Sequence, residues 1–259
     1  MNIDYLYEKG IVGLTKQEQG LAWLIENGPL VSEPALPRWM IESLVNNQRI
    51  LRLRRGLYLV PTTQGELPSL GKTITLLNPE GYITGQAALS LYGLNDQDII
   101  DWQVVSPVYQ ADFSYGLFGV HFIFSPVQAA NGERIYLDCG QDKVLVASVG
   151  QAFIDEVRFA GRNLNWLETA RTLKNALRSY KTDENKIETL LLTSPSTMIA
   201  RKIGFLLNVL QGVPNEGLLA LSREDHNTTL DSSGEFFDHT WRLKLPFSPQ
   251  EIKRGIHES

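Results

Sequence analysis

Four arginines crowd one short stretch of this sequence, and guanidinium groups at such density are typical of phosphate recognition. Arg49, Arg52, Arg54 and Arg55 lie within residues 49–60, interleaved with leucines. An arginine presents a planar fork of donors that can bind a phosphate through two hydrogen bonds at once. A solvated hairpin can also carry arginines, so the pattern alone leaves two interpretations open: contact with nucleic acid, or a hydrated turn.

The arginines are interleaved with an apolar pattern that predicts the element holding them. Leu51, Leu53, Leu57 and Leu59 alternate with polar residues as in two short strands, and residues 54–56 supply a tight turn that includes a glycine. A hairpin with arginines at its base and tip, directly after a short helix, is typical of the wing of a winged helix-turn-helix. We therefore expect Arg49, Arg52, Arg54 and Arg55 to contact DNA phosphates.

The helix expected before this hairpin has two distinct faces. Placing residues 36–47 at about 100° per residue separates an apolar face from a polar one. The apolar face holds Leu36, Met40, Ile41, Leu44 and Val45. The polar face holds Arg38, Trp39, Glu42 and Asn46.

This polar face offers donors to the edges of bases, and we expect it to contact DNA. Arg38 and Asn46 are the candidates for base readout. Glu42 is unfavourable beside phosphate but can accept a hydrogen bond from a cytosine amine. Trp39 has an alternative role, packing against the hairpin or the second domain.

A further helix is predicted upstream, where Thr15 and Glu18 form a capping box. Its inner face is apolar, and residues 27–29 (Asn-Gly-Pro) end it. We therefore predict a winged helix-turn-helix DNA-binding domain over residues 1–62. Residues 61–69 are rich in turn formers and form the linker to a C-terminal domain over residues 69–259.

The C-terminal domain is predicted to contain helices and strands in blocks. The expected helices are 70–78, 85–92, 151–159, 164–180, 183–192 and 195–210, the last opened by Ser194 and Pro195. The expected strands are 102–106, 117–124, 134–137, 144–148 and 240–245, followed by a polar tail. The fold class is therefore α+β: an N-terminal winged helix-turn-helix followed by a larger mixed α/β C-terminal domain.

Composition limits where nucleic acid could bind. The 259 residues carry a net charge of −5, which argues against indiscriminate coating of nucleic acid. Between Leu30 and Val60, however, five arginines stand against only Glu33 and Glu42. The sequence therefore indicates a local basic surface on an acidic protein.

Several features predict a protein of the cytoplasm. Cys139 is the single cysteine, which rules out an internal disulfide and favours a reducing compartment. The first residues do not resemble a signal peptide, and no apolar run approaches the ~18 residues of a membrane span. We expect a cytoplasmic protein with no membrane partner.

Catalytic motifs are missing from the sequence. It has no H-E-x-x-H, C-x-x-C, G-x-S-x-G or P-loop pattern. The acidic residues Asp96, Asp98 and Asp101 suggest a solvated loop, and Asp155 with Glu156 a surface or capping pair. We therefore expect no enzyme activity, no catalytic residues, no metal and no cofactor.

A basic stripe is the one feature of the C-terminal part that stands out. Arg171, Lys174 and Arg178 recur at helical spacing, and Lys181 extends the series. Such a stripe is more often a solvated helix face. The functional alternative is a docking surface for nucleic acid or an acidic partner.

Three segments together resemble the AbiEi antitoxins of bacterial type IV toxin–antitoxin systems, which are linked to abortive phage infection. They are residues 50–58 (ILRLRRGLY), 82–94 (YITGQAALSLYGL) and 147–155 (ASVGQAFID), and the resemblance spans residues 15 to about 210. The third segment departs from the family pattern, because Gln151 stands where a basic residue is usual.

The resemblance implies two functions. The N-terminal domain would bind inverted repeats in the promoter of its own operon and repress transcription. The C-terminal domain would counteract a co-encoded AbiEii-type nucleotidyltransferase toxin without a stable complex, with the basic stripe as the candidate antitoxin surface. Two alternatives stay open: a stand-alone winged-helix regulator whose C-terminal domain senses a ligand or partner, and an interaction protein that binds its toxin directly through the stripe.

Overall fold

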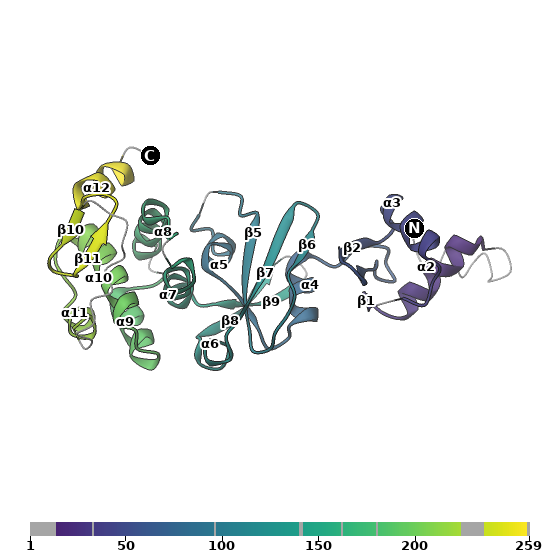
Figure 1. Ribbon diagram of the computed structural model, residues 1–259, viewed down its shortest axis with the longest axis horizontal. Coiled ribbons are helices and arrows are strands. Elements are labelled where there is room, and N and C mark those ends of the chain that lie inside the picture. Colours follow the sequence, from purple (N-terminus) through teal and green to yellow (C-terminus); the bar gives the residue numbers. More distant parts are fainter. Residues whose placement is uncertain are drawn as a thin grey trace. The chain divides into compact units, whose positions relative to one another are not determined.

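Helices and strands are mixed throughout the chain, which places the protein in the α+β class (Figure 1). The computed structural model describes residues 14–32, 34–95, 97–139, 142–161, 163–179, 181–223 and 236–257, with the side chain of His257 excepted. Within these residues, no helix has both the length and the apolar character required to cross a membrane.

The chain divides into two compact units. Unit 1 consists of Met1–Tyr82, Ile100–Pro126 and Tyr136–Leu145. Unit 2 consists of Ile83–Ile99, Val127–Ile135 and Val146–Ser259. The predicted boundary between residues 62 and 69 stays a prediction.

Unit 1 begins with two helices and a small antiparallel sheet. In chain order these are α2 (Lys16–Glu26), β1 (Leu30–Ser32), α3 (Arg38–Asn46), β2 (Leu51–Arg54) and β3 (Leu57–Leu59). The strand order is β1-β3-β2, so β3 is the central strand. The predicted helices and hairpin are therefore present within a residue or two of their expected bounds.

Local sequence explains both ends of α2. The Thr15 side chain accepts a hydrogen bond from the Glu18 backbone N–H, and the Glu18 carboxylate accepts one from the backbone N–H of Thr15. This arrangement is the predicted capping box. The helix ends before Gly28, whose φ of 99° is unfavourable for residues with a Cβ.

One apolar core joins α2, β1, α3 and β3. Leu21 and Leu24 of α2 pack with Ile41 and Leu44 of α3, and Leu24 is fully buried. Gly20 lies at the close approach of the two helices, where a Cβ would displace the sulfur of Met40. This core anchors α3 and leaves its polar face free to point outward.

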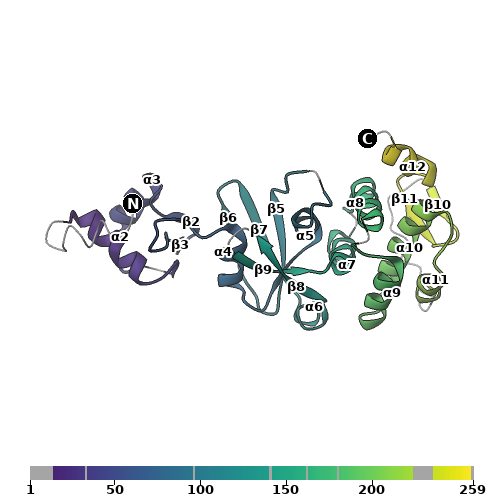
Figure 2. The ribbon, with the colours of Figure 1, turned by 180° about the vertical axis from the view of Figure 1, so that it is seen from behind.

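The rest of unit 1 is a helix and part of a mixed sheet. Helix α4 (Leu70–Leu77) is capped by Ser69, and β5 (Asp101–Ser106), β6 (Phe113–Tyr115) and β7 (Phe118–Phe124) follow. The three strands lie in the order β6-β7-β5, as Figure 2 shows. Strands β5 and β7 are parallel, and β6 and β7 form an antiparallel hairpin.

Two further strand pairs involve residues near the division of the chain. Strand β4 (Tyr82–Thr84) pairs in parallel with β9 (Asp142–Ala147), with Ile83 opposite Val146. Strand β8 (Arg134–Cys139) lies next to β9 in the strand order. Helices α5 (Gly85–Leu91) and α6 (Pro126–Asn131) belong to the same region of the sequence.

The C-terminal part of unit 2 is mainly helical. Its helices are α7 (Val149–Ala160), α8 (Trp166–Arg178), α9 (Glu184–Thr193), α10 (Thr197–Gln211), α11 (Glu216–Leu221) and α12 (Pro249–His257). The strands β10 (Phe236–Asp238) and β11 (Leu243–Leu245) form a two-stranded antiparallel sheet. Helix α8 packs against α7, α10 and α12.

Three expectations for this part were wrong in detail. Helix α10 begins at Thr197 with Ser196 as its N-cap, because Ser196 is extended and Pro195 lies before the cap. The last strand covers only Leu243–Leu245, because Arg242 has a φ of 52° that interrupts the extended chain. The predicted polar tail contains α12 instead.

The sequence does contain local signals for helix α12, which the prediction of a polar tail did not use. Ser248 and Glu251 form a capping arrangement in which the Glu251 carboxylate accepts the Ser248 N–H at 2.6 Å. Pro249 opens the first turn, where its missing N–H costs nothing. Ile252 and Ile256, four residues apart, are both buried. Because only these two isoleucines mark the apolar face, in a strongly charged segment, the helical pattern is weak.

Candidate nucleic-acid interface

Helix α3 exposes the face that was expected to contact DNA. Met40, Ile41 and Leu44 are buried, whereas the side chain of Arg38 is 92% exposed and Trp39 is 54% exposed. Asn46 is also exposed, and Glu42 is half-buried. The separation of polar and apolar faces is therefore confirmed, and Trp39 is not packed into a core.

The hairpin presents its arginines in the same way. Leu53, Leu57 and Leu59 are buried, whereas Arg52 and Arg55 are exposed. The strands end at Arg54 and resume at Leu57, so residues 55 and 56 form the turn. Gly56 has a φ of 76°, which suits a glycine in a tight turn.

Helix α3 and the hairpin together line one surface hollow of about 640 Å³. Its lining residues are Pro34, Leu36, Arg38, Ile41, Glu42, Arg52, Arg55, Gly56 and Tyr58. Arg38 from α3 and Arg52 and Arg55 from the hairpin thus face one space. Three cations and one carboxylate give this hollow a positive balance that favours an anionic ligand.

Glu42 holds Arg38 before any ligand binds. The Arg38 Nε donates to Glu42 Oε1 at 2.7 Å, one turn along the helix. This hydrogen bond raises the pKa of Arg38 above its usual value. The role expected for Glu42, accepting from a cytosine, would require it to share or exchange this partner. The contact itself holds the Arg38 guanidinium beside the Glu42 carboxylate on the exposed face of α3.

Tyr58 supports Arg52 at the other side of the hollow. The Arg52 guanidinium carbon lies 5.5 Å from the centre of the Tyr58 ring, and Tyr58 itself is only 8% exposed. Stacking on a fixed ring reduces the freedom of the guanidinium while its N–H groups stay available. Arg52 is therefore pre-oriented to donate hydrogen bonds to an anion.

Two arginines of the predicted interface lie elsewhere. Arg54 is half-buried and donates to the backbone carbonyl of Ala111, in the segment before β6. Arg49 lines a different hollow with residues of α2, among them Gln17 and Glu18. The structure thus brings Arg38, Glu42, Arg52 and Arg55 together and leaves Arg49 and Arg54 outside that group.

The basic stripe of α8 serves partly to bind helix ends in unit 2. Arg171 donates through Nε and Nη2 to the carbonyl of Gly255, at 3.2 and 2.7 Å, and Lys174 donates to the carbonyl of Ile256 at 3.5 Å. Both carbonyls belong to the last turn of α12, where a helix lacks internal donors and favours cations. Lys181 donates to the carbonyl of Tyr92, the C-cap residue of α5.

Arg178 is exposed and has no hydrogen bond or ion pair to the described residues, whereas Lys181 is exposed but bonded to Tyr92. A role of the stripe as an antitoxin surface stays a prediction. Sequence spacing could not reveal these capping bonds, because their acceptors lie about eighty residues away along the chain.

Of the two alternatives for Asp155 and Glu156, a surface pair or a capping pair, the surface pair is wrong, because both side chains are buried in unit 2. Asp155 accepts from the Thr84 hydroxyl and from Gln151 Nε2, each at 2.8 Å. Glu156 accepts from the backbone N–H of Gln86 at 3.2 Å, and burial raises its pKa. Gln151, where the resemblance would place a basic residue, thus pairs with a buried carboxylate.

A histidine between two carboxylates was missed by sequence reasoning. His121 of β7 lies 3.0 Å from Asp112 and 3.4 Å from Asp101. The hydrogen bond with Asp112 is the main cause of a raised His121 pKa. Asp101 had been expected in a solvated acidic loop with Asp96, which lies outside the described residues.

No group of three or more metal-binding side chains occurs among the residues described. Comparison with known protein families and with curated proteins finds no match to this chain.

Proposed function

We propose that the N-terminal part of unit 1 is a winged helix-turn-helix that binds double-stranded DNA. The observation that carries this proposal is the hollow between α3 and the hairpin, which Arg38, Arg52 and Arg55 line together. A DNA duplex presents phosphates beside its major groove. A helix in the groove can therefore contact base edges while an adjacent basic hairpin contacts the phosphates. A helix followed directly by a hairpin, and a three-stranded antiparallel sheet in the order β1-β3-β2, further support this proposal.

The exposed residues divide into two roles in this proposal. Arg52 and Arg55 on the hairpin contact phosphates and supply affinity that does not depend on sequence. Arg38 and Asn46 on α3 reach base edges in the major groove, with Glu42 orienting Arg38. Trp39 lies on the same face of α3 and adds apolar contact to sugars or thymine methyl groups.

A binding assay with the gene's own promoter tests the proposal. We expect the protein to bind that promoter more tightly than a scrambled duplex of equal length. Replacing Arg52 and Arg55 with alanine should weaken binding to both by roughly tenfold or more at physiological salt. The matched control K143A/R254A removes two exposed cations elsewhere and should bind within about twofold of the unchanged protein. Equal loss in both variants would reject the interface.

The resemblance to AbiEi antitoxins extends this proposal. The protein would repress its own operon at inverted repeats in the promoter and would counteract a co-encoded AbiEii-type nucleotidyltransferase toxin without a stable complex. No contact in the structure bears on antitoxicity, so this second function rests on the resemblance. The alternative is a stand-alone regulator with a C-terminal domain that senses a ligand or partner.

Growth rescue separates these possibilities. The neighbouring downstream gene is co-expressed with the full-length protein or with its R38A/R52A/R55A variant, each from a foreign promoter. Rescue by both would support an antitoxin function that is independent of DNA binding. Failure of both, with a proven toxin and soluble proteins, would leave the stand-alone regulator. Rescue with co-purification of the toxin would favour direct binding, with Arg178 as the exposed stripe residue that has no hydrogen bond to the described residues.

A further inference from the structure

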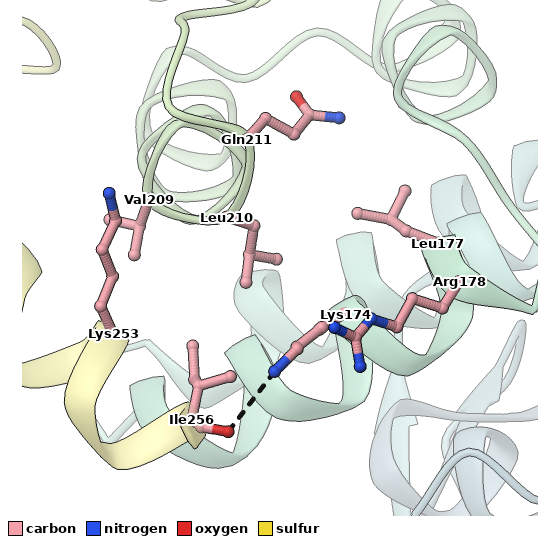
Figure 3. A pocket seen from close by; sticks show the side chains of 8 residues that line it. All are labelled: Lys174, Leu177, Arg178, Val209, Leu210, Gln211, Lys253 and Ile256. Atoms are coloured by element: carbon pink, nitrogen blue, oxygen red, sulfur yellow. Dashed lines mark hydrogen bonds between the residues drawn. The ribbon is translucent and has the colours of Figure 1, made fainter. Parts of the chain in front are cut away.

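A hollow of about 470 Å³ lies among α8, α10 and α12 in unit 2 (Figure 3). Its lining residues are Lys174, Leu177, Arg178, Val209, Leu210, Gln211, Lys253 and Ile256. Its volume falls within the range of about 300–1,000 Å³ that is usual for sites of small molecules. The hollow is therefore large enough for a small ligand.

Three cations surround this hollow without a carboxylate among the described lining residues. Lys174 and Arg178 lie one turn apart on α8, and Lys253 approaches from α12. Like charges brought together raise the local potential, and an anion would relieve their repulsion. Lys174 donates one of its three N–H groups to the Ile256 carbonyl, as the dashed line in Figure 3 shows.

The carboxylates on the same two helices, Glu168 of α8 and Glu251 of α12, have other partners. Glu168, on the same helix as Lys174, lies 4.0 Å from Arg171 and accepts from Gln97 Nε2 at 3.4 Å. Glu251, on the same helix as Lys253, caps α12 through Ser248. Neither neutralises the cations that line the hollow.

The remaining wall of the hollow is aliphatic. Leu177, Val209, Leu210 and Ile256 supply it, and Figure 3 shows Leu210 and Ile256 between Lys253 and Lys174. Among the described residues, no aromatic side chain lines the hollow, so none of these residues would stack on a nucleobase. An aliphatic wall between cations fits a ligand that joins an apolar chain to an anionic head.

We infer that this hollow binds a small amphiphilic anion, with a carboxylate or phosphate head on an aliphatic body. The cations of α8 and α12 hold the head, and the leucine, valine and isoleucine side chains cover the chain. The site lies wholly within unit 2 and does not depend on the proposed DNA contacts.

Calorimetric titration of the full-length protein tests the inference with four probes of equal chain length. They are octanoate, octyl phosphate, octanol and octylammonium, all at concentrations below micelle formation. We expect at least one of the two anions to bind at submillimolar to millimolar concentration, and the neutral and cationic probes to bind at least about tenfold more weakly. The anion that binds more tightly identifies the head group.

Variants locate the binding. R178Q/K253Q removes two exposed cations that have no structural hydrogen bond to the described residues, and it should weaken anion binding by roughly tenfold or more. R254Q removes an exposed neighbour on α12 that does not line the hollow, and it should bind within about twofold of the unchanged protein. L210W fills the hollow and should abolish binding; if it fails to fold, R178Q/K253Q decides.

Three results would overturn the inference. Binding of octanol as tight as that of the tighter of the two anions would show that only the apolar surface matters. Unchanged anion affinity in R178Q/K253Q would place binding elsewhere on the protein. A lack of heat and of any shift in melting temperature with both anions at millimolar concentration would leave the hollow without this ligand class.

Discussion

Replacing Arg52 and Arg55 together is expected to change the salt dependence of DNA binding by a predictable amount. Each phosphate neutralised by a cation contributes about −0.9 to the slope of log affinity against log salt. Both side chains are exposed and line the hollow beside α3, so their loss should flatten the slope by about 1.8. Over a fourfold rise in salt, from about 50 to 200 mM, the affinity of the unchanged protein should then fall about twelvefold further than that of the variant.

Arg54→Ala provides the contrast within the same hairpin. The Arg54 guanidinium is half-buried and donates to the Ala111 carbonyl, so it has less freedom to reach a phosphate. We expect its replacement to flatten the slope by well under one unit. Fluorescence anisotropy with a short labelled duplex, measured at several salt concentrations, gives all the slopes.

Two outcomes would refute this reasoning. A slope change in R54A as large as that in R52A/R55A would show that the contact with Ala111 does not restrain Arg54. The same flattening in K143A/R254A would show that net charge, and not the hairpin, sets the salt dependence.

Three further predictions concern stability and specificity. Leu24→Ala should lower the free energy of unfolding by about 2–5 kcal/mol, because Leu24 is fully buried in the core of α2 and α3. Urea unfolding measures this change, and a loss below roughly 1 kcal/mol would contradict the packing. R38A and N46A should each reduce the preference for the promoter over a scrambled duplex by roughly tenfold while changing the salt slope little, and uniform weakening on both duplexes would argue against base readout. His121 has a raised pKa, chiefly through Asp112, so its stabilising contribution is fully present below its ordinary pKa and is lost as pH rises through the raised value. Urea midpoints across that pH range should show this loss in the unchanged protein and not in H121N, and identical profiles would contradict it.

The elements of the proposed interface could be predicted because their signals are local. The capping box of α2 involves residues three apart, and the hairpin is marked by alternating leucines around a glycine turn. The two faces of α3 follow from helical periodicity within nine residues. None of these features depends on a contact with a distant part of the chain.

The misassigned residues depend on distant contacts instead. Asp155 and Glu156 are buried because Thr84 and Gln86, about seventy residues earlier, supply their hydrogen bonds. The sequence near residue 155 does not predict those distant donors. A pair of adjacent carboxylates without visible partners is ordinarily a surface pair, since burial of a charge requires compensation.

The arginines of α8 and those of the hairpin differ in whether their N–H groups already have acceptors, and the sequence does not reveal this difference. On α8, Arg171 directs two of its N–H groups at one carbonyl in the last turn of α12. On the hairpin, Arg52 and Arg55 have no hydrogen-bond acceptor among the described residues, and Arg52 is supported only from below by the Tyr58 ring.

Whether an arginine can bind an anionic ligand therefore depends on how many of its N–H donors have no acceptor in the folded protein, and not on its charge alone. An arginine whose donors already have acceptors would have to give up those bonds to bind a phosphate, which reduces the net gain. An exposed arginine on a fixed ring has no such bond to lose. By this measure Arg52, Arg55 and Arg178 are the residues free to meet a ligand, whereas Arg54 and Arg171 hold the fold, and the order of their mutational effects on binding should follow that division.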